Sequence, residues 1–247
     1  MIKPRETDLL LVWERGRGVK PARRGLMMLA TAFPELERED LAAWSIGTHN
    51  RKLIALFQML FGQRVMGGAV CPACEETLGF DLSLDQLGFS EAVVTPELRE
   101  ESFGEYTIGF RPPRVAHLHQ ATTLPNLSEA YAYLVRASLE SVALAGRTLE
   151  PEELPPEVIA AVGAQIAQLD PGAEILLAMT CHTCAYAWQI NFETSAFLWQ
   201  RIALVAKRLL TETAMLARAY GWSEREILEM TATRRETYLE LMGEIAP

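Results

Sequence analysis

All four cysteines of the chain stand in two C-x-x-C pairs, Cys71–Cys74 and Cys181–Cys184. This spacing lets one tight turn present two thiolates to the same tetrahedral ion, and two such turns complete a four-cysteine zinc site. The sequence therefore predicts one structural Zn²⁺ per chain, bound by Cys71, Cys74, Cys181 and Cys184.

The two pairs are separated by 106 residues (75–180), far more than in a compact zinc ribbon. The residues that follow them nevertheless match, because apolar side chains recur at equivalent alternate positions beyond each pair. They are Leu78, Phe80 and Leu82 in one copy and Trp188, Ile190 and Phe192 in the other. Such alternation is typical of a strand with one buried face. We expect two equivalent turn-and-strand units that form a zinc ribbon split by a long insertion.

Other uses of these cysteines fit the pattern less well. A redox C-x-x-C pair would be followed by a helix, whereas the residues here favour strands. Four thiolates leave no position for water, so a zinc bound by them would be structural rather than catalytic. Buried, reduced cysteines without a metal are the remaining alternative.

Histidines offer two further ligand candidates. His182 lies between the cysteines of the second pair, where we expect it to point outward. His117 and His119 form an H-x-H pair without a nearby carboxylate, and a loop or strand is the preferred interpretation of that stretch. Phosphate-binding glycine loops, H-E-x-x-H and G-x-S-x-G motifs are all absent from the sequence. We therefore expect a non-enzymatic protein.

The elements that position the cysteines divide the chain into five segments, which we interpret as parts of one integrated domain. Residues 1–62 form an N-terminal helical region, and 63–112 carry the first cysteine pair and strands. Residues 113–172 form a helical insertion, 173–193 carry the second pair and its strand, and 194–247 form C-terminal helices. The predicted fold class is α+β and mostly α-helical, with helices around the small split zinc ribbon.

The C-terminal segment contains the longest predicted helix, from Thr194 to Tyr220. Its apolar residues advance by steps of four and three, as in a coiled-coil stripe, with Glu212 as an interruption. This face belongs either to the core or to a docking surface. Gly221 is a plausible cap, and Ser223 with Glu226 has the form of a capping box.

Charge and hydropathy narrow the choice of partners. The net charge is −9, which disfavours nucleic-acid binding because that depends on Lys and Arg neutralising phosphates. The densest basic stretch contains Arg15, Arg17, Lys20, Arg23 and Arg24. No apolar run is long enough to cross a bilayer or to serve as a signal peptide, so we expect no membrane association and a cytoplasmic location.

Several stretches, spread almost from end to end, resemble one known family. They are WERG (13–16), LFG (60–62) leading to CPAC, LEPEELP (149–155), AEILLAMTC (173–181) and AFLWQRI (196–202), and the most specific are ARAYGWSEREILEM (217–230) and RRETYLELM (234–242). The chain is similar in these to the T4-type baseplate hub assembly chaperones, in the zinc-knuckle form found in operons for contractile phage tails and tail-like injection particles. The chain departs from the family pattern at two places. One is Glu75, where the family usually has glycine, and the other is His182-Thr183 in the second pair. Neither departure removes a ligand.

The resemblance implies an assembly chaperone or minor structural component of a contractile baseplate. Such a protein acts through protein–protein contacts and has no catalytic activity. The implied partners are baseplate hub or wedge proteins, and a cytoplasmic protein of this kind could be incorporated into the particle. Trp222 and Tyr238 are the candidate partner-binding residues. A zinc-ribbon nucleic-acid-binding or regulatory protein is the alternative.

Overall fold

The computed structural model describes residues 1–87 and 98–245. Residues 88–97 of the predicted 63–112 segment and 246–247 of the predicted C-terminal segment lie outside the described residues. Within the described part, the chain is a mixed helical and β structure whose sheets are small. No helix there combines the length and apolarity needed to cross a membrane.

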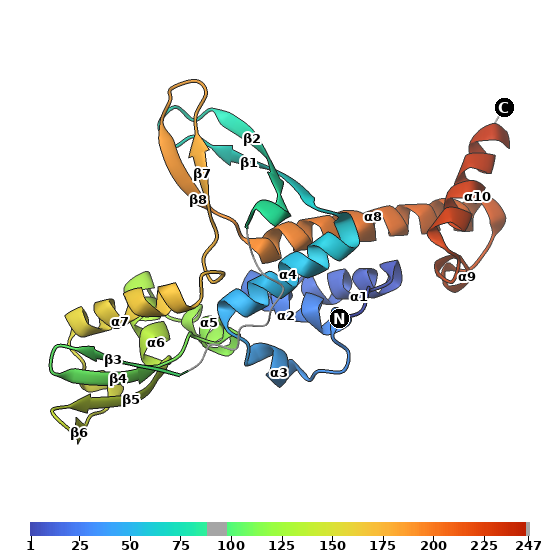
Figure 1. Cartoon of the computed structure of the whole chain (residues 1–247). Helices are drawn as coiled ribbons and strands as arrows, with labels where there is room; N and C mark the ends of the chain where they lie inside the picture. Colours follow the sequence, from blue (N-terminus) through green and yellow to red (C-terminus); the bar gives the residue numbers. More distant parts are fainter. Residues whose placement is uncertain (88–97, 246–247) are drawn as a thin grey trace.

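A helical body contains the helix that precedes the first hairpin and the helix that follows the second (Figure 1). Its helices are α1 (Glu6–Gly16), α2 (Pro21–Ala32), α3 (Arg38–Ala42), α4 (Ile46–Phe61) and α8 (Thr194–Tyr220). Leu29, Leu53, Leu56, Leu198 and Ile202 are completely buried in their shared core. The packing of α4 on α8 brings together the helix that enters the first hairpin and the helix that leaves the second.

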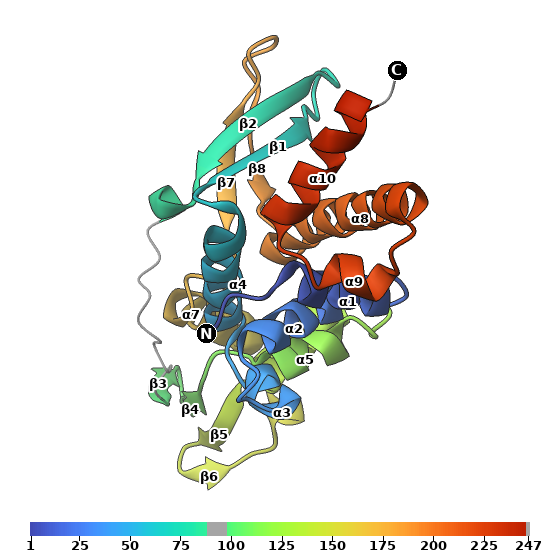
Figure 2. The same cartoon turned by 90° about the vertical axis from the view of Figure 1, so that its right-hand side faces the viewer.

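Two β-hairpins rise from this body side by side (Figures 1 and 2). One consists of β1 (Arg64–Val70) and β2 (Thr77–Ser83), and the other of β7 (Leu176–Thr180) and β8 (Ala187–Asn191). Both are antiparallel, with Val70 opposite Thr77 and Thr180 opposite Ala187 next to the turns. The strands predicted after each cysteine pair are therefore confirmed as β2 and β8.

The insertion between the hairpins forms a second lobe with its own core. It contains β3 (Arg99–Phe103), β4 (Tyr106–Phe110), α6 (Leu127–Arg136), β5 (Leu139–Leu144), β6 (Arg147–Thr148) and α7 (Pro156–Leu169), with a 3₁₀ helix at 151–153. The helix α5 (Val115–Ala121), which connects β4 to α6, and the 3₁₀ helix at 84–87, which follows β2, pack Val115 and Leu84 into the core of the helical body instead. The strands form one sheet in the order β3-β4-β5-β6. Ile108, Phe110, Val142 and Val162 are buried between the sheet and the helices.

This lobe corrects the prediction that 113–172 is helical. Residues 139–148 form β5 and β6, because β5 pairs along β4 and places Val142 opposite Ile108. A strand of this kind depends on a partner that precedes it by about thirty residues, so helix periodicity alone does not reveal it. His117 and His119 likewise lie on the short helix α5, whereas we expected a loop or strand.

Helices α9 (Glu224–Leu228) and α10 (Ala232–Ile245) lie at the far end of α8 (Figure 1). Gly221 ends α8 in the left-handed conformation (φ 69°), and the Ser223–Glu226 capping box starts α9, as predicted. Glu212, the interruption in the α8 stripe, is buried and accepts a hydrogen bond from Arg235 Nε at 2.9 Å. Arg235 also pairs with Glu6, so this ionic network joins α10, α8 and α1.

Candidate metal centre

Each cysteine pair forms the same backbone turn at the end of a hairpin. The amide of Cys71 donates to the carbonyl of Glu76 (2.8 Å), and the amide of Glu75 donates to that of Cys71 (2.9 Å). In the second turn Cys181 donates to Tyr186 and Ala185 donates to Cys181, both at 2.9 Å. The two turns are therefore equivalent in hydrogen bonding, as the matching sequence registers predict.

The four thiols converge where the two turns meet. Cys71 Sγ lies 3.7 Å from Cys184 Sγ, and Cys74 Sγ lies 3.6 Å from Cys181 Sγ. All four sulfurs lie within 4.8 Å of one another. A tetrahedral zinc with bonds of about 2.3 Å would set its sulfurs roughly 3.8 Å apart. The cluster thus has the size required for one such ion, with each close contact joining one hairpin to the other.

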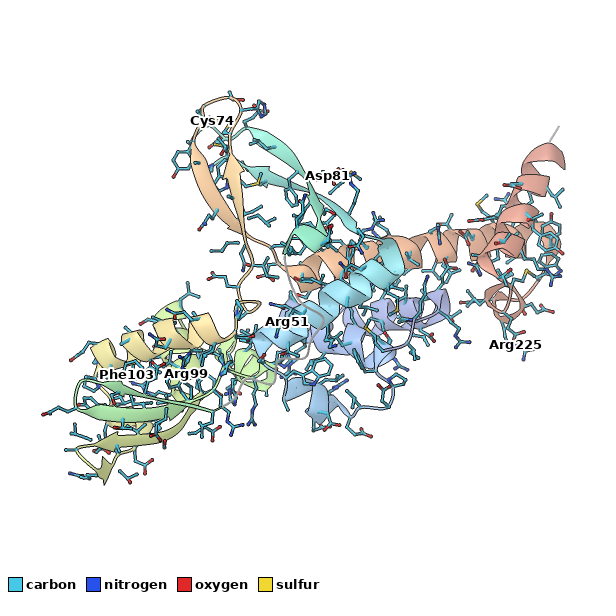
Figure 3. All side chains as sticks on the ribbon, viewed as in Figure 1. Arg51, Cys74, Asp81, Arg99, Phe103 and Arg225 are labelled. Carbon is cyan, nitrogen blue, oxygen red and sulfur yellow. The ribbon has the colours of Figure 1, made fainter. Side chains whose placement is uncertain are left out.

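The site has a buried side and an open side. Cys71 and Cys181 are buried and pack with Leu78, Met179 and Trp188, whereas Cys74 and Cys184 are exposed. Figure 3 shows Cys74 at the tip of the hairpins, far from the helical body. The apolar layer beneath the sulfurs holds the hairpins together from inside, and a metal would hold them together at the tip.

The thiols also perturb one another electrostatically. Backbone N–H groups of Cys184 and Thr183 lower the pKa of Cys181 to about 6. The amide of Glu76 acts in the same direction on Cys74, yet the surrounding thiols, Cys184 foremost, raise the pKa of Cys74 to about 12. Four thiolates this close repel, so full ionisation of the cluster requires a cation in its centre.

Two backbone positions complete the turns and were not singled out as site residues. Glu75 (φ 61°) and Ala185 (φ 58°) both adopt the left-handed conformation immediately after the second cysteine of their pair. Glycine takes this conformation without steric cost. The resemblance leads one to expect glycine at position 75, so that expectation was the sequence signal for a left-handed residue at this point of the turn.

The other candidate residues do not belong to the cysteine cluster. His182 is exposed, and in the part of the chain that the structure describes the four cysteines form the only cluster of three or more potential metal ligands. His117 lies on α5, where its Nδ1 accepts a hydrogen bond from the amide of Arg114. Trp222 stacks on Tyr220 (4.5 Å between ring centroids) and meets Tyr238 of α10 edge-on (4.8 Å), so both candidate partner residues belong to one half-buried aromatic cluster.

Comparison with known proteins adds no relative: no family model, no curated protein and no solved structure matches the chain.

Proposed function

We propose that Cys71, Cys74, Cys181 and Cys184 bind one structural Zn²⁺ in a split zinc ribbon. The observation that carries this proposal is the convergence of four sulfurs from turns 106 residues apart, at distances suited to tetrahedral zinc. Two turns with the same hydrogen bonds would contribute two ligands each. The ion would tie the hairpin before the insertion to the hairpin after it.

On this scaffold we propose a non-enzymatic assembly factor or minor structural component of a contractile phage tail-like baseplate. The support is the resemblance of stretches from WERG at 13–16 to RRETYLELM at 234–242. The proposed partners are hub or wedge proteins of the baseplate, reached through protein–protein contacts. A coordinatively complete four-thiolate ion would leave no open position for substrate, in keeping with a structural role.

The arrangement of the basic stretch disfavours the nucleic-acid-binding alternative. Arg24 lies over the ring of Trp199 (4.4 Å to the centroid) and donates to the carbonyl of Gly16. Arg17 lies over Trp13 at 5.0 Å. Two of the five cations are thus engaged within the protein, which reduces what the stretch offers to phosphates.

Quantitative mass spectrometry of purified particles, beside the soluble fraction of the same cells, tests the proposed role. We expect the chain either in particles at a fixed low copy number or in the soluble fraction bound to a hub or wedge protein. The first result makes it a structural component, and the second makes it a chaperone. Its absence from both would contradict the proposal.

A further inference from the structure

A groove on the helical body, remote from the cysteines, has the chemistry of a docking site. It has a volume of about 430 Å³ and lies between the N-terminal segment, the end of α4 and the middle of α8. Its apolar lining includes Leu60, Phe61, Leu204 and Val205. Leu204 is 59% exposed although it lies in the middle of a 27-residue helix, so it is available to cover an apolar side chain from outside.

The groove is positively charged in a protein of net charge −9. Its lining contains Lys3, Arg201 and Arg208 against one carboxylate, Glu6. That carboxylate already pairs with Arg208 and Arg235. Arg201 is exposed, and its guanidinium lies 5.4 Å from the ring centroid of Phe61, which holds the cation beside the apolar lining.

This charge distinguishes the groove from the other large hollow near it. A hollow of about 970 Å³ lies between the start of α1 and α9–α10. Its lining balances Arg5, Arg225 and Arg235 against Glu6, Glu224 and Glu229. The larger hollow therefore selects for neither sign of charge, whereas the smaller groove favours an anionic occupant.

We propose that this groove docks an acidic amphipathic segment of a partner protein. Apolar side chains of the segment would pack on Phe61, Leu204 and Val205, and its carboxylates would face Arg201 and Lys3. A volume of this size accommodates the few side chains that one face of a short helix presents. Because the protein as a whole carries a net charge of −9, a positively charged groove favours docking of an acidic segment at this place. The inference rests on the proposed function, and it assigns the contact to a surface different from that of Trp222 and Tyr238.

Fluorescence anisotropy with a defined peptide tests the docking. The probe is a labelled peptide of about 14 residues in which Leu recurs every three or four positions and most others are Glu, and a matched peptide carries Lys for Glu. We expect the Glu peptide to bind and the Lys peptide not to bind. Arg201→Glu and Leu204→Glu should each weaken binding at least about tenfold. Raising the salt concentration should weaken it further.

Matched controls lie on the same helix outside the groove. Arg218→Glu and Met215→Glu change an exposed cation and an exposed apolar residue of α8 and should leave the affinity unchanged. Melting curves of all four variants are needed to check that each one folds. The docking site is overturned if the Glu peptide fails to bind at up to about 1 mM, or binds the groove variants as tightly as the controls. This measurement uses no particles, so its failure is distinct from failure of the baseplate proposal.

Discussion

His49 is a buried titratable residue that neither the metal centre nor the groove uses. Its imidazole packs against Gly25 of α2, and its Nε2 has no hydrogen-bond partner within the described residues. Burial, assisted by the charge of His119, lowers the pKa of His49 to about 4. The packing of α2 on α4 therefore accommodates only the neutral form of this histidine.

Stability should accordingly fall in mild acid. In the unfolded chain this histidine takes up a proton near pH 6.5, whereas in the folded protein His49 is protonated only near pH 4. The free energy of unfolding therefore keeps its full value above pH 6.5 and decreases as the pH falls from 6.5 to about 4. The shift corresponds to about 3 kcal/mol in the free energy of unfolding. Denaturant unfolding of His49→Gln should show a shallower pH slope than the wild type. His117→Gln, at a half-exposed residue, should change the slope less, and an unchanged slope in His49→Gln would refute the assignment.

At the scale of elements, one carboxylate joins the second lobe to the helical body. Asp170 follows α7 and is 2% exposed, and its Oδ2 accepts a hydrogen bond from the amide of Gly47 at the start of α4 (2.7 Å). The guanidinium of Arg51, on the same helix, approaches Asp170 Oδ1 within 3.8 Å. A Cβ at Gly47 would come within 2.0 Å of Asp170 Oδ1, so this close approach requires glycine. The carboxylate also faces the positive end of the α4 dipole.

Asp170→Ala should therefore weaken the junction. It leaves the buried amide of Gly47 without an acceptor, at a cost of about 2 kcal/mol. Denaturant unfolding measures the loss, and limited proteolysis should show cleavage around 170–173 that the wild type resists. Asp81→Ala removes a carboxylate from an exposed ion pair with Arg64 and should have little effect. Equal losses in the two variants would show that Asp170 has no special role.

The elements that were predicted correctly are those determined by local residues. Both predicted ends of α8, Thr194 and Tyr220, match the structure, and the C-terminal end was predictable because Gly221 terminates the helix. The turns and strands of the metal centre were predictable because each cysteine pair and its alternating residues are contiguous. Strand β5 was missed because its conformation depends on β4, and the groove was missed because Lys3, Phe61 and Arg201 are adjacent only after folding.

At the scale of the whole molecule, the chain leaves the helical body through β1 and β2, builds the second lobe, and returns through β7 and β8 (Figure 1). Packing of α4 on α8 and the Asp170–Gly47 contact hold the base of this long excursion. The hairpin tips have only a thin apolar layer beneath Cys71 and Cys181. A two-stranded hairpin is marginal by itself, so the tips are the part of the molecule that the proposed zinc would stabilise most.

Removal of zinc should therefore destabilise the molecule from the hairpins inward. Structural zinc contributes roughly 10–16 kcal/mol in zinc-finger peptides, enough to decide whether the tips remain folded. We expect elemental analysis to find one zinc per chain. Chelation or Cys181→Ser should lower the melting temperature, promote aggregation and speed hydrogen exchange in β1, β2, β7 and β8 before α8. His182→Ala changes an exposed residue of the same turn and should keep the metal. If the chelated protein kept its melting temperature and its exchange pattern, the apolar layer under the sulfurs would be enough to hold the hairpins together. The proposal of a structural zinc would then be wrong.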